Sequence, residues 1–163
     1  MYRVFIDGQA GTTGLQIHER LIAHPEIELL EIDPEERKNS DAKREITNLA
    51  DVVILCLPDE ASVKAVEDNK HSKARFIDTS TAHRTTSNWV YGFPELAQDQ
   101  RQKIASARLV SNPGCYPTGF LSAIRPLVDE NLLDHNALLT INALSGYSGG
   151  GRKFCLLYTS DAA

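Results

Sequence analysis

The sequence predicts an α/β fold built on a doubly wound, mostly parallel sheet. Short apolar segments alternate with segments of helical periodicity from residue 2 to residue 112, the pattern of a sheet with helices on both faces. The run VVILCL at 52–57 is apolar without interruption, as expected of a strand covered on both faces. A glycine-rich turn separates the first predicted strand from the first predicted helix.

The predicted strands are short segments rich in Val, Ile, Leu and Phe, bounded by residues that end strands, such as Gly, Pro, Asp and Asn. They cover 2–6, 27–33, 50–58, 74–80 and 107–112.

Helical periodicity follows the first and third of these strands. The segment 11–24 has an imperfect apolar stripe made of Leu15, Ile17, Leu21 and Ile22. The segment 60–70 has a predicted buried face made of Ala61, Val63 and Val66. The segment 33–45 mixes both charge signs and is interpreted as solvated surface.

The pattern changes after residue 114. The segment 119–133 predicts a helix interrupted by Pro126, and 137–144 predicts a strand that leads into the glycine-rich SGYSGGGR. We therefore predict one domain over 1–114 and the beginning of a second, α+β domain over 115–153.

Composition restricts the class of protein. The chain is 42% hydrophobic and 24% charged, ordinary values for a soluble globular protein. A net charge of −5 offers no basic surface for nucleic acid, and no apolar run approaches the length of about 20 residues needed to span a membrane. The three cysteines are odd in number and widely separated, which argues against a disulfide framework and against a metal site built on close cysteine pairs. With no secretory signal before YRVFIDG, we expect a cytoplasmic protein.

The glycine-rich turn DGQAGTTG is the first candidate site. Gly8, Gly11 and Gly14 have G-x-x-G-x-x-G spacing, one position away from the usual dinucleotide-binding G-x-G-x-x-G. Such glycines allow a tight turn and a close approach of a pyrophosphate to a helix N-terminus, where Thr12 and Thr13 add hydroxyl donors. We predict a dinucleotide site in a Rossmann-type domain; an ordinary glycine-rich turn is the alternative.

The residues leave the choice between NAD and NADP open. Asp33 lies near the end of the second predicted strand, where a carboxylate binds the ribose 2′-hydroxyl of NAD. Arg37 and Lys38 follow closely and offer cations for the 2′-phosphate of NADP.

Cys115 is the second candidate site. It lies between a predicted strand and a predicted helix, in the rigid setting SNPGCYPTG, and Pro117 suits a first helical turn. A helix N-terminus favours the thiolate, which is the reactive form of cysteine. We interpret Cys115 as a nucleophile, whereas Cys56, inside an apolar strand, is interpreted as structural.

Six motifs together resemble one enzyme family. In order along the chain they are GQAGTTG, CLPDEAS, IDTSTAHR, YGFPEL, SNPGCYPTG and SGYSGGGR. They resemble the N-acetyl-γ-glutamyl-phosphate reductases of arginine biosynthesis, of the shorter-chain type, from about residue 2 to residue 153. SNPGCYPTG and YGFPEL are the specific parts of this resemblance.

The resemblance implies NADPH-dependent reduction of a small-molecule acyl phosphate to an aldehyde, through a thioester on Cys115. It favours NADP as the cofactor, with Arg37 a candidate for the 2′-phosphate contact. The other implied cofactor contacts are Gly8, Gly11, Thr12, Thr13, Gly14, Pro58 and Ser80. The implied substrate contacts are Ser145, Gly146 and Arg152, with His83-Arg84 as a further possible anion contact.

The chain departs from the family in two respects. Family members are about twice as long, form homo-oligomers, and place their catalytic histidine well beyond the cysteine, whereas no histidine follows His135 here. The segment 154–163 does not continue the family pattern and is interpreted as a non-native tail, so Cys155 receives no role. We expect a truncated chain that is inactive by itself.

Two other functions remain open. An aspartate-semialdehyde dehydrogenase shares the glycine turn and the cysteine, but it typically has asparagine where Gly114 stands. The other is a non-catalytic nucleotide-binding or redox module that uses Cys115.

Overall fold

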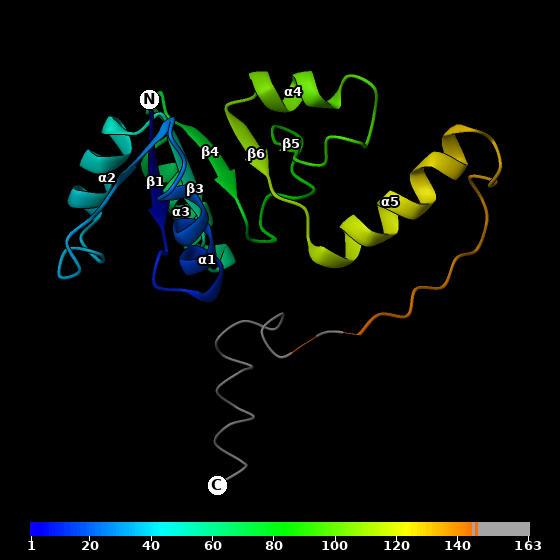
Figure 1. Cartoon of the computed structure of the whole chain (residues 1–163), viewed down its shortest axis with the longest axis horizontal. Helices are drawn as coiled ribbons and strands as arrows, with labels where there is room; N and C mark the ends of the chain where they lie inside the picture. The colour runs from blue at the N-terminus through cyan, green and yellow to red at the C-terminus, as the bar shows by residue number, and fades with distance from the viewer. Residues whose placement is uncertain (145, 147–163) are drawn as a thin grey trace, which may run out of the picture.

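The computed structural model of the chain describes residues 1–144 and residue 146. Its strands are β1 (Tyr2–Asp7), β2 (Ile27–Leu30), β3 (Val52–Leu55), β4 (Arg75–Asp78), β5 (Val90–Tyr91) and β6 (Leu109–Ser111). They form a six-stranded sheet in the order β2-β1-β3-β4-β6-β5, in which every neighbouring pair is parallel (Figure 1). All five predicted strands are present, and β5 is an addition.

The helices are α1 (Thr12–Leu21), α2 (Ser40–Leu49), α3 (Asp59–Asp68), α4 (Gln100–Ser106) and α5 (Cys115–Asp129). The step from β1 to β2 and the step from β2 to β3 run in opposite directions across the sheet. Right-handed crossovers therefore place α1 and α2 on opposite faces. The predicted doubly wound α/β fold is confirmed.

The core lies on the three central strands. Phe5 of β1, Val53 and Leu55 of β3, and Phe76 of β4 are each at most 2% exposed. Full burial of such a side chain contributes about 1.5–3 kcal/mol to folding. This core holds rigid the strand ends that carry the candidate site.

Helix α2 occupies a segment that the sequence analysis took for solvated surface. The Asn39 side chain caps it, accepting hydrogen bonds from the backbone N–H groups of Asp41 at 2.9 Å and Ala42 at 3.4 Å. Most of the segment 33–45 is exposed, as predicted; the exception among its charged residues is Lys43, which is half-buried. The helix itself was not predicted, because its apolar face is short: Thr47 is buried and Ile46 packs against the core.

The inward faces of α1 and α3 match the predicted ones in part. In α3, Val66 packs against the core as predicted, whereas Ala61 and Val63 are exposed and the fully buried residue is Ser62, which meets the end of β4. In α1, Ile17 and Leu21 are half-buried, whereas Leu15 and Ile22 are exposed and the fully buried residue is Gly14. Each helix thus also buries a small residue, which periodicity of large apolar residues does not reveal.

Helix α5 continues through Pro126, so the predicted interruption is wrong; a proline removes one backbone N–H, and the remaining hydrogen bonds carry the helix to Asp129. The predicted strand at 137–144 is irregular, with Leu138 and Leu144 fully exposed. A strand needs a neighbour for its backbone groups, and no described residue supplies one. Figure 1 shows this segment, in orange, turning back after α5 and running below it, apart from the strands of the sheet. Within 1–144, no helix is both long and apolar enough to cross a membrane.

Candidate active site at the carboxyl edge of the sheet

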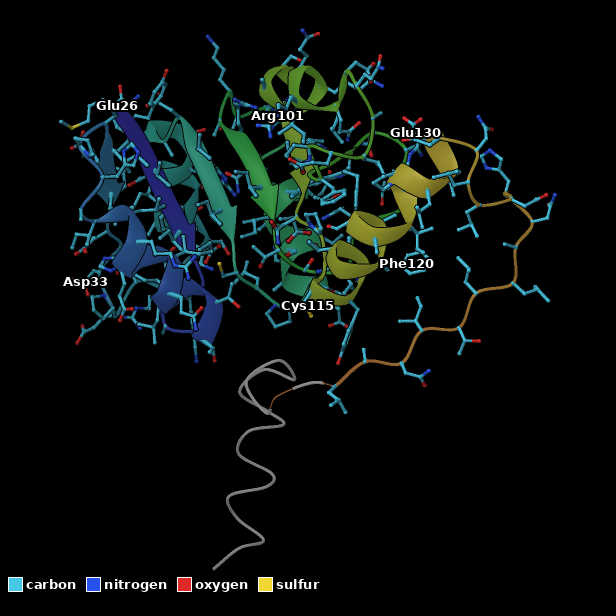
Figure 2. All side chains as sticks on the ribbon, turned by 45° about the vertical axis from the view of Figure 1, so that its right-hand side comes forward. Glu26, Asp33, Arg101, Cys115, Phe120 and Glu130 are labelled. Carbon is cyan, nitrogen blue, oxygen red and sulfur yellow. The ribbon has the colours of Figure 1, made fainter. Side chains whose placement is uncertain are left out.

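The candidate residues gather at one edge of the sheet. The glycine turn follows β1, Pro58 follows β3, the loop 79–84 follows β4, and Cys115 comes shortly after β6. The carboxyl ends of parallel strands meet at the same edge, where ligands bind in open α/β sheets. Figure 2 shows Cys115 at that edge, at the beginning of α5.

Two glycines of the turn are required by its geometry. Gly8 has φ of +93°, and a Cβ there would lie 2.2 Å from the carbonyl oxygen of Cys56. A Cβ on Gly14 would lie 2.4 Å from the Gly8 carbonyl oxygen. The turn therefore packs backbone directly against β3 and against α1, leaving the space above it open.

The N-terminus of α1 has free donors. Gly11 is its N-cap, and no side chain caps the helix. The first backbone N–H groups of a helix have no partner within it, so those of Thr12 and Thr13 are available to an anion. This is the geometry that a pyrophosphate requires.

A cavity of about 140 Å³ adjoins the turn and is lined in part by Gly8, Gln9, Ala10, Arg37 and Lys43. A second cavity of about 180 Å³ shares Lys43 with the first and also contacts Lys38 and Lys64. Together they form a hollow with an apolar floor and a cationic rim.

One ion pair lines both cavities. The Lys43 ammonium lies 2.7 and 3.0 Å from the two carboxylate oxygens of Asp7, which is buried at the end of β1. A buried carboxylate is stable when it is paired in this way. Sequence reasoning missed both residues, since their contact joins positions far apart in the chain.

Of the three residues named for the choice between NAD and NADP, Lys38 lines the second cavity, while Asp33 and Arg37 lie in different surroundings. The Asp33 carboxylate accepts a hydrogen bond from the Glu35 backbone N–H at 2.9 Å, within its own turn. Arg37 lines the cavity beside Gly8, and its side chain forms no hydrogen bond or ion pair with another residue of the described part. Of the two, only Arg37 is brought to the glycine turn.

Cys115 is the first residue of α5 and is exposed. Gly114 is the N-cap, and its carbonyl oxygen accepts hydrogen bonds from the Thr118 backbone N–H at 3.0 Å and hydroxyl at 2.8 Å. Pro117 lies in the first turn, as predicted. The thiol thus stands at a positive helix terminus that no side chain caps.

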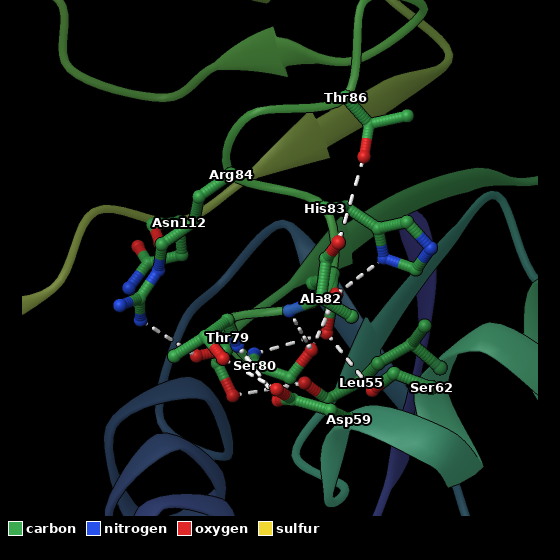
Figure 3. Close-up of polar contacts among 12 residues, drawn as sticks. Leu55, Asp59, Ser62, Thr79, Ser80, Ala82, His83, Arg84, Thr86 and Asn112 are labelled. Atoms are coloured by element: carbon green, nitrogen blue, oxygen red, sulfur yellow. Dashed lines mark hydrogen bonds and ion pairs between the residues drawn. The ribbon is translucent and has the colours of Figure 1, made fainter.

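A buried polar network lies behind the site. Asp78, at the end of β4, is fully buried, and its carboxylate accepts hydrogen bonds from the hydroxyls of Ser62 at 3.0 Å and Ser80 at 2.7 Å. His83 Nδ1 lies 2.6 Å from the same carboxylate (Figure 3). The His83 ring stacks on Trp89, with ring centroids 4.0 Å apart. The sequence pattern marked Ser80 and His83 as candidate contacts but not their bonds to Asp78.

This network occupies two of the candidate residues. The Ser80 hydroxyl points inward to Asp78, and the His83 ring is buried, so neither polar group is presented to the edge of the sheet. Arg84 is turned toward backbone: it donates to the carbonyl oxygens of Asn112 and Thr79. Pro58 is the exposed N-cap of α3 and lies at the expected edge.

Two further groups surround the site. Hydrogen bonds from the hydroxyl and the backbone N–H of Thr81 lower the pKa of Asp59, at the beginning of α3. Burial raises the pKa of the Cys56 thiol to about 11. A thiol with so high a pKa is protonated at neutral pH, which fits the structural role predicted for Cys56.

Of the predicted substrate contacts, Ser145 and Arg152 lie outside the described residues, as does Cys155. Gly146 is described, and a Cβ there would have open space around it.

Comparison with known families gives two matches in sequence order. Residues 32–104 match the NAD binding domain of semialdehyde dehydrogenase, and residues 115–159 match the dimerisation domain of the same enzyme.

Relatives and solved structures agree with these matches. The chain is 52% identical over 158 residues to the N-acetyl-γ-glutamyl-phosphate reductase of Trichormus variabilis, covering 97% of this chain and 49% of the relative. It is 51% identical over 152 residues to that of Brucella ovis, covering 93% and 49%. The chain thus spans about half the length of the curated relatives it matches.

The solved structures are more distant and show the fold alone. The aspartate semialdehyde dehydrogenase of Francisella tularensis superposes with a TM-score of 0.71 at 16% identity, over 98% of this chain and 50% of that one. Aspartate semialdehyde dehydrogenase II of Vibrio cholerae gives a TM-score of 0.64 at 16% identity, over 94% and 49%. With half of its residues identical to those of the reductases over nearly its whole length, the chain belongs to the N-acetyl-γ-glutamyl-phosphate reductase family.

Proposed function

We propose that this chain carries the cofactor site and the nucleophile of an NADPH-dependent reductase that converts N-acetyl-γ-glutamyl phosphate to N-acetylglutamate 5-semialdehyde, in arginine biosynthesis. The observation that carries this proposal is the position of Cys115 at an uncapped helix N-terminus, on the same sheet edge as the glycine turn. The close identity to reductases of this name supports the substrate.

The cofactor fits the residues that are present. The turn at Gly8 and Gly14 leaves no room for a Cβ, so a pyrophosphate can lie against backbone N–H groups at the beginning of α1. Arg37 is free to bind a 2′-phosphate, which favours NADP over NAD. When bound, NADPH supplies a hydride to the acyl carbon of the substrate.

Cys115 performs the covalent chemistry. Its thiolate attacks the acyl carbon of the substrate, the bond from that carbon to the phosphate oxygen breaks, and phosphate leaves with the bonding electrons. A thioester then joins Sγ to the acyl group. Once the thioester carbon is reduced, its C–S bond breaks, the aldehyde forms and Sγ leaves as the thiolate. This route divides one difficult displacement into two easier steps.

The remaining predicted contacts belong to the same proposal. Gly11, Thr12, Thr13 and Pro58 line the cofactor side; Ser80 contributes through its backbone, since its hydroxyl is bonded to Asp78. Ser145, Gly146 and Arg152 remain the proposed substrate contacts.

For the domains, we keep the division into 1–114 and 115–153, with 154–163 as a tail. The interval between the two matched family segments supports the boundary, and the dimerisation domain match supports a homo-oligomer. An aspartate-semialdehyde dehydrogenase activity is less favoured, because identity to those enzymes is 16%.

Phosphate release tests the proposal. Mixing the chain with N-acetyl-γ-glutamyl phosphate should release a burst of about one phosphate per chain, above the spontaneous hydrolysis rate. The Cys115→Ser variant is the matched control and should give no burst. A burst of equal size in both proteins would contradict the role of Cys115.

A further inference from the structure

We propose that Arg84 is a positioning residue: its guanidinium fits against Gly114 and fixes the loop that presents Cys115. The inference rests on the proposed function in one respect, that Cys115 is the nucleophile. No contact of Arg84 with the substrate is required.

The contacts of Arg84 join two elements that are distant in sequence. Its Nε donates to the carbonyl oxygen of Asn112 at 3.1 Å, and its Nη2 donates to that of Thr79 at 3.2 Å. Figure 3 shows the guanidinium of Arg84 between these two residues. One side chain therefore connects the end of β4 with the loop that precedes α5.

Gly114 provides the space for this arrangement. A Cβ on Gly114 would lie 2.7 Å from Nη1 of Arg84 and 3.3 Å from its Cζ. The φ of Gly114 is −75°, which any residue adopts, so the backbone itself does not require glycine. Glycine is required at this position because the Arg84 guanidinium occupies the space that a Cβ would fill.

A shift of Gly114 would move the nucleophile. Its carbonyl oxygen accepts two hydrogen bonds from Thr118, which close the first turn of α5, and Cys115 is the first residue of that turn. Displacements near 1 Å can reduce a reaction rate about a hundredfold. Fixing Gly114 thus fixes the approach of Sγ to a substrate.

The loop that carries Arg84 is itself anchored on both sides. Thr81 is hydrogen-bonded to Asp59 of α3, and His83 to the buried Asp78. The guanidinium therefore extends from a rigid base. Because the backbone of this loop is already ordered, contact with the Asn112 carbonyl costs mainly the rotamer entropy of the Arg84 side chain.

The first test is a double-mutant cycle on Arg84→Ala and Gly114→Ala, with Arg84→Lys as the conservative variant and Arg101→Ala as the control. Arg101 is exposed and, among the residues that the structure describes, pairs with Glu95 alone. The readout is amide hydrogen exchange at Asn112 and Thr118, which bond to Asp78 and Gly114.

We expect each single substitution to speed exchange at these amides about tenfold or more, since hydrogen bonds to charged groups are comparatively strong. Arg84→Lys should restore part of the protection. In the Arg84→Ala background, Gly114→Ala should add little, because the closest collision, with Nη1 at 2.7 Å, is gone and only the 3.3 Å approach to Pro117 Cδ remains. Unchanged exchange in Arg84→Ala, additive effects of the two substitutions, or an equal rise at all amides would overturn the proposal.

The second test separates positioning from substrate binding. The rate of Cys115 acylation is followed at increasing concentrations of N-acetyl-γ-glutamyl phosphate. We expect Arg84→Lys to lower the maximal rate while the half-saturating concentration stays unchanged. A raised half-saturating concentration with unaltered amide exchange would make Arg84 a phosphate contact and overturn the proposal. If the wild-type chain is not acylated, the proposed function fails, while the exchange cycle still decides the role of Arg84.

Discussion

At the scale of single residues, Cys56 and Cys115 lie in different surroundings. Cys115 is exposed at a helix N-terminus, whereas burial, with smaller effects from the nearby carboxylates of Asp7 and Asp78, raises the pKa of Cys56 to about 11. Only thiolates react with alkylating reagents at useful rates. The two side chains should therefore differ widely in reactivity.

Iodoacetamide labelling checks this difference. In a Cys155→Ser background at pH 8, we expect Cys115 to be alkylated first and Cys56 to react only as the pH approaches 11. Peptide mass mapping at several times gives both rates. Equal labelling of the two cysteines in the native chain at pH 8 would contradict the assignment.

The cofactor selectivity should depend on Arg37. Removing one or two hydrogen bonds between this cation and a phosphate should weaken NADP binding about 10- to 100-fold and leave NAD binding nearly unchanged. Calorimetric titration of Arg37→Ala and Asp33→Ala with both dinucleotides measures this. A similar loss of affinity for NAD and NADP in Arg37→Ala would show that the cation does not face the 2′-phosphate.

Gly8 should tolerate no side chain. We expect Gly8→Ala to destabilise the fold by about 2 kcal/mol or more and to abolish dinucleotide binding, because φ of +93° and a 2.2 Å approach both oppose a Cβ. Gly119→Ala is the matched control: it lies in α5 with open space around it and should be neutral or slightly stabilising. Denaturant titration compares the two, and equal stability of both variants contradicts the geometry of the turn.

At the scale of elements, the sequence predicts the strands and helices whose signal is local and apolar. β1, β3, β4 and β6 follow from short runs of buried residues. β5 has two residues, Val90 and Tyr91, too few for a periodic signal. α2 and α4 escape because charged and polar side chains dominate them.

The same distinction applies to the site. The glycine turn and Cys115 lie within contiguous motifs and were predicted. The Asp78 network joins Ser62, Ser80 and His83 through a buried carboxylate. Which strand end faces which helix is decided by tertiary packing, so a single sequence does not contain that information in readable form.

The stabilisation from the contact between Asp59 of α3 and Thr81, in the loop after β4, should depend on pH. Hydrogen bonds from Thr81 lower the pKa of Asp59 below its ordinary value of 3.8. A folded-state pKa below the unfolded one contributes stability that is present above the unfolded value and lost as the pH falls through the folded one. We expect Thr81→Val to flatten this acid dependence of the unfolding free energy, measured by urea titration from neutral pH downward. An unaltered slope would contradict the connection.

At the scale of the whole molecule, the parallel sheet explains how residues from four separate segments come together. β1, β3, β4 and β6 all end at the same edge, so the turn at Gly8, Pro58, the loop 79–84 and Cys115 converge without direct sequence proximity. Helices α1 and α5 both begin at this edge. The sheet therefore brings a helix N-terminus and a thiol to one edge.

The central claim is that Cys115 takes the acyl group of N-acetyl-γ-glutamyl phosphate. Intact mass spectrometry after incubation with this substrate, followed by peptide mapping, tests it most directly. We predict a mass gain of one N-acetylglutamyl group on Cys115 that is absent in Cys115→Ser. A folded, NADP-binding chain that gains no such mass, or gains it on another residue, would contradict the account.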